Sequence, residues 1–286
     1  MSRIAIIGGG NMGEALLAGL IKSGRPTRDL VVAEKLSGRA EYLSRTYSAR
    51  VTGLADAVED AAFLILAVKP GDVDAITTEI ADAAAKAQGN SVEQVLVSVV
   101  AGVTSGFYES RLPAGFPVIR VMPNTPALVG AGVSALAPGR FATAEQLAEA
   151  AQLFESVGGV LTVSESQIDA VTAVSGSGPA YFFLFLEALV DAGVANGLTR
   201  PVATDLAAQT MAGSAAMLLE RLESARSDNS GRPDTTAAEL RALVTSPGGT
   251  TAAGLRELER GGLRAAVAAA VDAAKTRSEQ LGITYE

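Results

Sequence analysis

A glycine-rich turn close to the N-terminus places the strongest constraint on the fold. The sequence GGGNMG occupies residues 8–13, directly after the apolar run Ile4–Ile7 and before a stretch with helical spacing at residues 14–23. The pattern G-x-G-x-x-G between a buried strand and a helix is typical of dinucleotide-binding βαβ units. A glycine turn that is merely flexible is the weaker alternative.

Each glycine of the pattern has a separate physical task. Gly8 permits the tight turn, Gly10 lets the backbone approach a pyrophosphate, and Gly13 lets the helix pack closely on the strand. The N-terminus of the helix then faces the phosphates. The sequence therefore predicts a nicotinamide-dinucleotide site at this turn.

The rest of the chain falls into an α/β part and a helical part. Up to about residue 163, β-branched runs alternate with Ala-rich amphipathic stretches, which predicts a Rossmann-type doubly wound parallel sheet. Strands are expected at Ile4–Ile7, Leu30–Ala33, Phe63–Val68, Val95–Val100, Val118–Met122, Val133–Ala137 and Val160–Val163. From Ser166 onward the periodicity is helical. Helices are expected at Ser166–Asn196, Pro201–Ser224, Thr235–Thr245, Thr251–Arg260 and Leu263–Leu281, with an exposed polar loop at Ser224–Asp234.

With 286 residues, the chain is long enough for two domains, which we place at residues 1–163 and 164–286. Its formal charge is −8 and it has no basic run, which argues against nucleic-acid or membrane-surface partners and favours small molecules. The N-terminus has no signal-peptide pattern, so an intracellular, cytoplasmic protein is expected. The apolar run Phe182–Leu186 is followed by Glu187 and Asp191, and we interpret it as part of a buried helix rather than a membrane span.

The chain contains neither Cys nor His, which excludes disulfides, thiol nucleophiles, His triads and the usual zinc ligands, so no metal site is expected. Alcohol oxidation by a nicotinamide enzyme needs a general base, commonly His or a Lys from the helical domain. There is no Lys between Lys86 and Lys275. Imine reduction does not need such a base, because an imine can arrive protonated or take its proton from a hydroxyl or water.

The end of the second strand bears on the choice of cofactor. Glu34 lies where an acidic side chain accepts hydrogen bonds from the adenosine ribose, which favours NADH. Lys35 and Arg39 follow, and either could neutralise the 2′-phosphate of NADPH. Both basic residues could equally be solvated charges at the start of a helix, so the sequence leaves the cofactor open.

Polar and proline-containing segments follow other strands at the carboxyl edge, where ligands of parallel sheets bind. They are LAVKP at residues 66–70, with Lys69 and Pro70, VSVVAG at 97–102, and RVMPNTP at 120–126. For each, a structural turn is the alternative.

Two segments of the helical part are also candidates. SGSGPAY at residues 175–181 must break or kink a helix, either for a ligand or for close helix packing. SPGGTT at residues 246–251 precedes a helix, so glycine amides, hydroxyls and the helix dipole converge on a spot suited to a carboxylate. A capping role for Thr is compatible with that site.

These blocks together resemble the pyrroline-5-carboxylate reductase family along nearly the whole chain. GGGNMG, LAVKP and RVMPNTP take part in the resemblance, and SGSGPAYFFLFLEAL and LVTSPGGTTAAGLRELERGGLRAAV are its most specific parts. The resemblance implies a Rossmann-type domain for NADPH or NADH and an all-α substrate and dimerisation domain. It also implies an active site between protomers, with dimers often assembled into a decamer, and reduction of 1-pyrroline-5-carboxylate to L-proline.

The same resemblance implies roles for individual residues. Ser246, Gly248, Gly249 and Thr250 would hold the substrate carboxylate, and Thr251 would bind the ring nitrogen and donate its proton. Glu165 would reach the substrate side. The cofactor contacts would be Gly8, Gly10, Asn11, Met12, Gly13, Glu34, Lys35, Ala67, Val68, Lys69, Pro70, Ser98, Val99, Ala101 and Pro179.

The chain departs from the family pattern in three places, one of which is a lengthened Ser-rich loop before residue 234. Residues 234–237 are Asp-Thr-Thr-Ala where many members have His-Pro, and Glu34 replaces the Ser or Arg of members that prefer NADPH. Another imine or keto-acid reductase on the same fold is the closest rival interpretation. A non-catalytic NADP sensor or scaffold is the other, and it would not need the carboxylate site.

Overall fold

The computed structural model describes residues 3–86, 93–227 and 236–283. Contacts divide the chain into two units, residues 1–179 with 271–286, and residues 180–270. The segment 164–179 is thus grouped with the sheet, while the boundary after Val163 remains a prediction from sequence periodicity.

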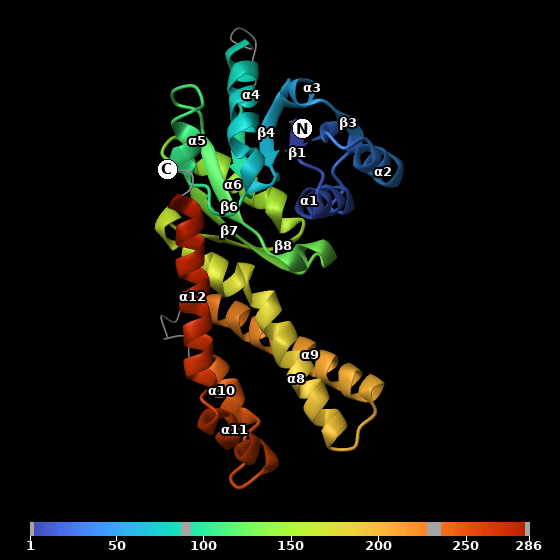
Figure 1. Cartoon of the computed structure of the whole chain (residues 1–286), viewed down its shortest axis with the longest axis vertical. Coiled ribbons are helices and arrows are strands. Elements are labelled where there is room, and N and C mark those ends of the chain that lie inside the picture. Colours follow the sequence, from blue (N-terminus) through green and yellow to red (C-terminus); the bar gives the residue numbers. More distant parts are fainter. Residues whose placement is uncertain (1–2, 87–92, 228–235, 284–286) are drawn as a thin grey trace. The chain divides into compact units, whose positions relative to one another are not determined.

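The described part of the first unit forms one eight-stranded sheet (Figure 1), in the order β3-β2-β1-β4-β5-β6-β7-β8. The strands from β1 to β6 are parallel, and β7 pairs antiparallel with β6 and parallel with β8. The strands are β1 (Arg3–Ile7), β2 (Leu30–Ala33), β3 (Arg50–Thr52), β4 (Ala61–Leu66), β5 (Val95–Ser98), β6 (Val118–Met122), β7 (Gly132–Pro138) and β8 (Gly158–Thr162). The Rossmann-type sheet is confirmed, with an antiparallel pairing that strand patterns alone did not predict.

Helices cover both faces of the sheet, and strand residues alternate between two cores. One core packs Ile4 and Ile6 of β1 against α1 (Asn11–Lys22), α2 (Ser37–Tyr47) and α6 (Ala144–Glu155). The other packs Ala5 and Ile7 against α3 (Leu54–Val58), α4 (Val73–Lys86) and α5 (Ser105–Glu109). Because both faces are buried, the central strands are apolar throughout.

Several predicted strand ends were wrong. β4 runs from Ala61 to Leu66 rather than from Phe63 to Val68, because the chain leaves the ladder before Pro70, which has no N–H to donate. β5 ends at Ser98 instead of Val100, where the backbone N–H of Val100 bonds to the Ser98 hydroxyl at 3.3 Å. The three-residue edge strand β3 was missed because it is too short to show a pattern.

The helix predicted at Ser166–Asn196 is broken, as the glycines and Pro179 indicated. A short turn at Glu165–Gln167 leads into α7 (Ile168–Val171) and a wide π-type turn at Thr172–Gly176, and α8 (Gly178–Ala195) then begins. Pro179 has no N–H for the carbonyl four residues earlier, that of Ser175. That carbonyl accepts a hydrogen bond from Asn124 Nδ2 at 3.2 Å instead.

The helices of the C-terminal part follow the prediction closely. They are α9 (Arg200–Ser227), α10 (Thr236–Leu243), α11 (Thr250–Arg260) and α12 (Leu263–Ile283). The expected loop from Ser224 starts later, because α9 continues to Ser227, and residues 228–235, including Asp234 and Thr235, lie outside the described residues.

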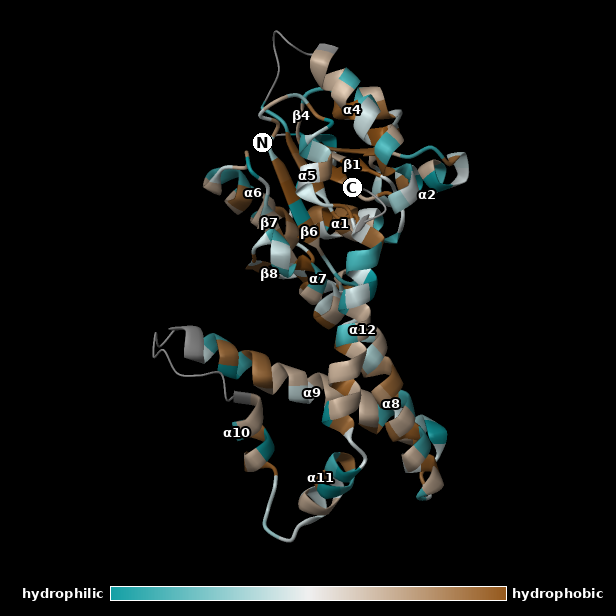
Figure 2. Cartoon of the chain, turned by 60° about the vertical axis from the view of Figure 1, so that its left-hand side comes forward, coloured by the Kyte–Doolittle hydropathy of each residue, from teal (hydrophilic) through white to brown (hydrophobic). Residues whose placement is uncertain are grey.

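The interpretation of Phe182–Leu186 as part of a buried helix was wrong for the single chain. Phe182, Phe183 and Leu184 are 62%, 66% and 68% exposed. Figure 2 shows hydrophobic residues along α8 in brown and tan. Among the described residues, one stretch, Glu165–Ala195, is long and apolar enough by composition to cross a membrane. An exposed apolar face of this size marks an interaction surface.

Candidate active site

The carboxyl ends of β1, β2, β4 and β5 are tied together at one edge of the sheet. Gly8 N donates to Ala33 O at 2.9 Å, Ala67 N donates to Ile7 O at 2.8 Å, and Val99 N donates to Leu66 O at 3.0 Å. β1 lies where the chain switches from building the sheet on one side to building it on the other. Ligands of open α/β sheets bind at this switch point.

The glycine turn leaves room where a cofactor phosphate needs it. Gly8 has φ +101°, and a Cβ there would lie 2.5 Å from Ala67 O. A Cβ at Gly13 would lie 2.0 Å from Gly8 O, whereas a Cβ at Gly10 would meet nothing within 4 Å. Gly8 and Gly13 therefore build the turn, and Gly10 borders open space at the start of α1. This arrangement fits a dinucleotide pyrophosphate, with Asn11 and Met12 in the first turn of the helix.

The acidic residue after β2 binds the glycine turn itself. Glu34 Oε2 accepts a hydrogen bond from Gly9 N at 3.0 Å, and Oε1 accepts one from Leu36 N at 2.8 Å. The Glu34 carboxylate thus joins the β1–α1 turn to the β2–α2 turn.

A polar cluster that we did not predict lies beside this turn, around Glu14. The Glu14 carboxylate accepts hydrogen bonds from Tyr42 at 3.0 Å, from Tyr47 at 2.7 Å, and from Arg39. Burial opposes ionisation of Glu14, but these three donors outweigh it and hold the pKa of Glu14 below its usual value. Burial and the bond to Glu14 raise the pKa of Tyr47 to about 12.

The two lysines at the carboxyl edge of the sheet, Lys35 and Lys69, differ in their contacts. Lys35 Nζ forms an ion pair with Asp72 at 2.9 Å, and its side chain is 72% exposed. Lys69 and Pro70 are exposed after β4, while Ala67 and Val68 are half-buried. These four residues line the exit from β4, next to Gly8, as the sequence indicated.

At the exit from β5, the hydroxyl of Ser98 is not free for a ligand. Ser98 is fully buried, and its Oγ lies 2.7 Å from the Tyr108 hydroxyl. Val99 and Ala101 are half-buried. The cofactor contact predicted for Ser98 remains a prediction.

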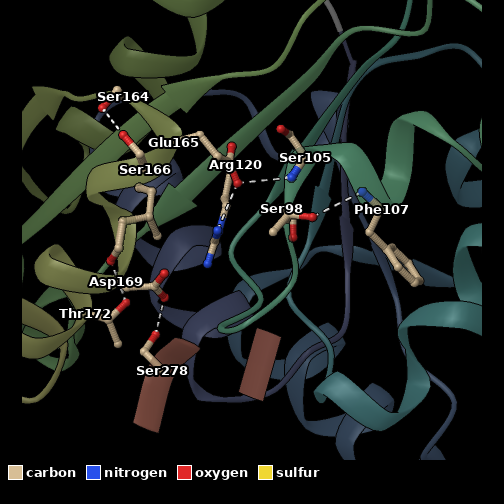
Figure 3. Close-up of polar contacts among 12 residues, drawn as sticks. Ser98, Ser105, Phe107, Arg120, Ser164, Glu165, Ser166, Asp169, Thr172 and Ser278 are labelled. Atoms are coloured by element: carbon tan, nitrogen blue, oxygen red, sulfur yellow. Dashed lines mark hydrogen bonds and ion pairs between the residues drawn. The ribbon is translucent and has the colours of Figure 1, made fainter. Parts of the chain in front are cut away.

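Glu165 takes part in a buried ion pair (Figure 3). Its Oε1 accepts hydrogen bonds from Arg120 Nη1 at 2.9 Å and from Ser105 N at 3.2 Å. The Arg120 side chain is only 4% exposed, so the pair compensates a buried charge on β6. Glu165 Oε2 is buried and has no partner among the described residues. The role predicted for Glu165 toward substrate remains a prediction, and its observed contacts position β6, α5 and the turn before α7.

Asn124 fixes the loop after β6. Its Oδ1 accepts from Val133 N at 2.9 Å, and its Nδ2 donates to Ser175 O. The RVMPNTP loop is thereby joined to β7 and to the π-type turn before Pro179, which is half-buried. This rigid loop had been a candidate for ligand contact, and its amide is used to hold the backbone.

The SPGGTT segment lies in the second unit and forms a tight turn before α11. Gly249 N donates to Ser246 O at 3.0 Å, Gly248 has φ +71°, and Ala253 N donates to Gly249 O at 3.1 Å. Gly249 caps α11 without a side-chain bond, so the hydroxyls of Thr250 and Thr251 are not used for capping. Ser246, Gly248, Thr250 and Thr251 are exposed in the single chain. This leaves amides and hydroxyls for an anionic ligand.

The sheet, the glycine turn at its switch point and the helical C-terminal part define an NAD(P)-dependent oxidoreductase of the Rossmann type. The family model described as "NADP oxidoreductase coenzyme F420-dependent" matches residues 3–102. The family model described as "Pyrroline-5-carboxylate reductase dimerisation" matches residues 165–281.

Known proteins narrow this class to one family. The chain is 66% identical to a pyrroline-5-carboxylate reductase of Mycobacterium tuberculosis strain H37Rv, over 100% of the chain and 99% of that protein. The solved pyrroline-5-carboxylate reductase of Coxiella burnetii matches with a TM-score of 0.87 and 33% identity, covering 98% of both chains. The pyrroline carboxylate reductase of Plasmodium falciparum, solved with NADP bound, matches with a TM-score of 0.80 and 28% identity, also over 98% of both chains. The chain belongs to the pyrroline-5-carboxylate reductase family.

Proposed function

We propose that the chain reduces the C=N bond of 1-pyrroline-5-carboxylate to give L-proline, the last step of proline biosynthesis. NADPH is the reductant, with NADH as a possible substitute. The observation that carries the proposal is the 66% identity to a pyrroline-5-carboxylate reductase over the entire chain. The NADP in the Plasmodium structure supports the choice of NADPH.

The residues around the glycine turn suit the cofactor. Gly10, Asn11 and Met12 offer open space and helix-start amides for the pyrophosphate, and Ala67–Pro70 with Val99 and Ala101 border the same edge. When bound, the nicotinamide supplies the hydride. We assign Pro179 to the nicotinamide side on the family resemblance.

The substrate is held by the turn before α11. Amides and hydroxyls of Ser246, Gly249 and Thr250 bind the carboxylate, assisted by the positive end of the helix. The Thr251 hydroxyl would donate a hydrogen bond to the ring nitrogen and pass it a proton, which Thr251 would regain from solvent water. One C–H and one N–H bond thus replace the C=N π bond, and positioning is the main catalytic contribution.

The same proposal includes a homo-oligomer built on the helical part, with dimers assembled into a decamer. The dimerisation family model and the exposed apolar face of α8 support the dimer. It also includes a cytoplasmic location, which suits a reaction between small soluble metabolites.

The experiment is a direct assay of the purified chain with 1-pyrroline-5-carboxylate, following the loss of NADPH absorbance, and separately that of NADH. We expect rapid oxidation of NADPH and formation of proline in equal amount. A control with a six-membered cyclic imine carboxylate tests ring size. If neither reductant is oxidised although both bind, the chain is a sensor rather than a reductase.

A further inference from the structure

The middle glycine of the phosphate-binding turn is held from both sides by charged side chains. Gly9 N donates to Glu34 Oε2 at 3.0 Å, and Gly9 O accepts from Arg39 Nε at 2.5 Å. Glu34 follows β2 and Arg39 lies in the first turn of α2, so one short segment clamps both polar groups of Gly9.

Glu34 has a structural role at this turn. An acidic residue that selects NADH directs its oxygens to the ribose hydroxyls. In this chain both oxygens of Glu34 accept backbone N–H groups, those of Gly9 and Leu36. These bonds partly stabilise its negative charge and make it a structural clamp.

Arg39 keeps donors available beside the clamp. A guanidinium has five N–H donors, and the contacts to Gly9 and Glu14 use two of them, which leaves three. The Arg39 side chain is 27% exposed, so it is not fully enclosed at the turn. Guanidinium groups bind phosphate through paired, charge-assisted hydrogen bonds.

Glu14 fixes the position of Arg39. The Glu14 side chain is 18% exposed, and its carboxylate is held by Tyr42 and Tyr47, both on α2, at 3.0 and 2.7 Å. Arg39 also lies over the Tyr42 ring, with 5.0 Å from Cζ to the ring centroid. A long side chain that would otherwise lose rotamer freedom on binding a ligand is thus already ordered.

Lys35, the other candidate cation, is directed elsewhere. Its ammonium pairs with Asp72, in the turn after β4, and not with the glycine turn.

We propose that Arg39 recognises the 2′-phosphate of NADPH, and that Glu14 is the positioning residue that sets the preference for NADPH over NADH. The proposal rests on the proposed function only in assuming that a nicotinamide dinucleotide binds the glycine turn. Glu14 acts through Arg39, with Tyr42 and Tyr47 holding its carboxylate.

The test measures dissociation constants of NADP⁺ and NAD⁺ by calorimetry on the full chain, without catalysis. Arg39→Ala should raise the dissociation constant of NADP⁺ by about 10- to 100-fold, the range for losing a charge-assisted hydrogen bond. The dissociation constant of NAD⁺ should rise by less than about threefold. Glu14→Gln should weaken NADP⁺ by about 3- to 10-fold and leave NAD⁺ within about twofold. A merely structural role would weaken both cofactors equally.

Controls separate the alternatives. Arg45→Ala removes one positive charge from an exposed position of the same helix and should leave the ratio of the two constants unchanged. Equal losses for both cofactors in Arg39→Ala, or a selective loss in Lys35→Ala instead, overturn the role of Arg39. Tighter NADP⁺ binding by Glu14→Gln means that Glu14 competes with the phosphate, and overturns its positioning role. If the unaltered chain binds neither cofactor, the proposed function itself fails.

Discussion

One added methyl group should lower stability at Gly13 and weaken cofactor binding at Gly10. At Gly13 the methyl carbon would lie 2.0 Å from the carbonyl oxygen of Gly8 and 3.3 Å from Ile6 Cγ2. The first contact is with backbone, so α1 or the turn must shift. Overpacking of this kind costs roughly 1–3 kcal/mol, and we take the upper end because of the short distance.

Alanine favours the helix over glycine by about 1 kcal/mol, which offsets part of that cost. Gly13→Ala should therefore lower the free energy of unfolding by about 2 kcal/mol. For a chain of this size the melting temperature would fall by roughly 3 °C.

Gly10→Ala is the matched variant. Its methyl would meet nothing within 4 Å, and Gly10 has φ −66°, which any residue adopts. Alanine is the poorer N-cap by about 0.5–1 kcal/mol, and the reduced freedom of the unfolded chain offsets about the same amount. Stability should be unchanged, while NADP⁺ should bind at least about tenfold more weakly because the methyl occupies the phosphate space.

Thermal unfolding of the two variants checks the expected stabilities, and calorimetric titration checks the expected NADP⁺ affinities. A melting temperature of Gly13→Ala within about 1 °C of the unaltered chain would refute the close packing of α1 on the turn. Unchanged NADP⁺ affinity in a stable Gly10→Ala variant would refute the placement of the pyrophosphate at Gly10.

Four further predictions concern the substrate turn, the helical face and the Glu14 cluster. Thr251→Ala should lower kcat by about 100-fold, and Thr251→Ser should restore most of it; steady-state kinetics showing only a raised KM would contradict the proton-donor role. Phe183→Glu, at a position 66% exposed, should break the oligomer into monomers in sedimentation, and an oligomer of unchanged size would place the interface elsewhere. Because the pKa of Glu14 is lowered, its stabilisation is present above its ordinary value of 4.5 and is lost as the pH falls further, so the difference in melting temperature between the unaltered chain and Glu14→Gln should shrink below about pH 4. The pKa of Tyr47 is raised to about 12, so its stabilisation is complete below pH 10, and the difference from Tyr47→Phe should shrink as the pH rises toward 12; a constant difference would contradict the coupling to Glu14.

The sequence was informative where a local pattern has a local cause. The glycine turn was predictable because Gly8 and Gly13 touch atoms only a few residues away or on the neighbouring strand end. The break before α8 was predictable because Pro179 lacks a donor whatever its surroundings. The strands of the sheet centre were predictable because burial on both faces makes them apolar without interruption.

The polar clusters were not predictable, because their partners are far apart in the chain. Glu14 binds side chains 25 to 33 residues later, and Arg120 binds Glu165 45 residues later. Sequence patterns of charge identify pairs three or four residues apart on one helix, and neither cluster is of that kind. Only the fold brings α1 to α2, and β6 to the turn before α7.

The apolar stretch of α8 shows a different limit of prediction from sequence. It also links the assembly of protomers to catalysis. Hydropathy shows that these residues must be covered, but not whether the same chain or a second copy covers them. Within residues 180–270 the buried core of the described part consists of Val190, Ala203 and Ala207, while Phe182 and Phe183 remain exposed. Three small buried side chains stabilise a unit of this length poorly.

We therefore expect this unit, which carries the turn at Ser246–Thr251, to gain much of its order from a second copy of the chain. Variants that separate the protomers should lose activity even though no substrate contact has changed, and activity should depend on protein concentration. An interface variant that is monomeric and fully active at nanomolar concentration would show that the turn before α11 is ordered by its own chain alone.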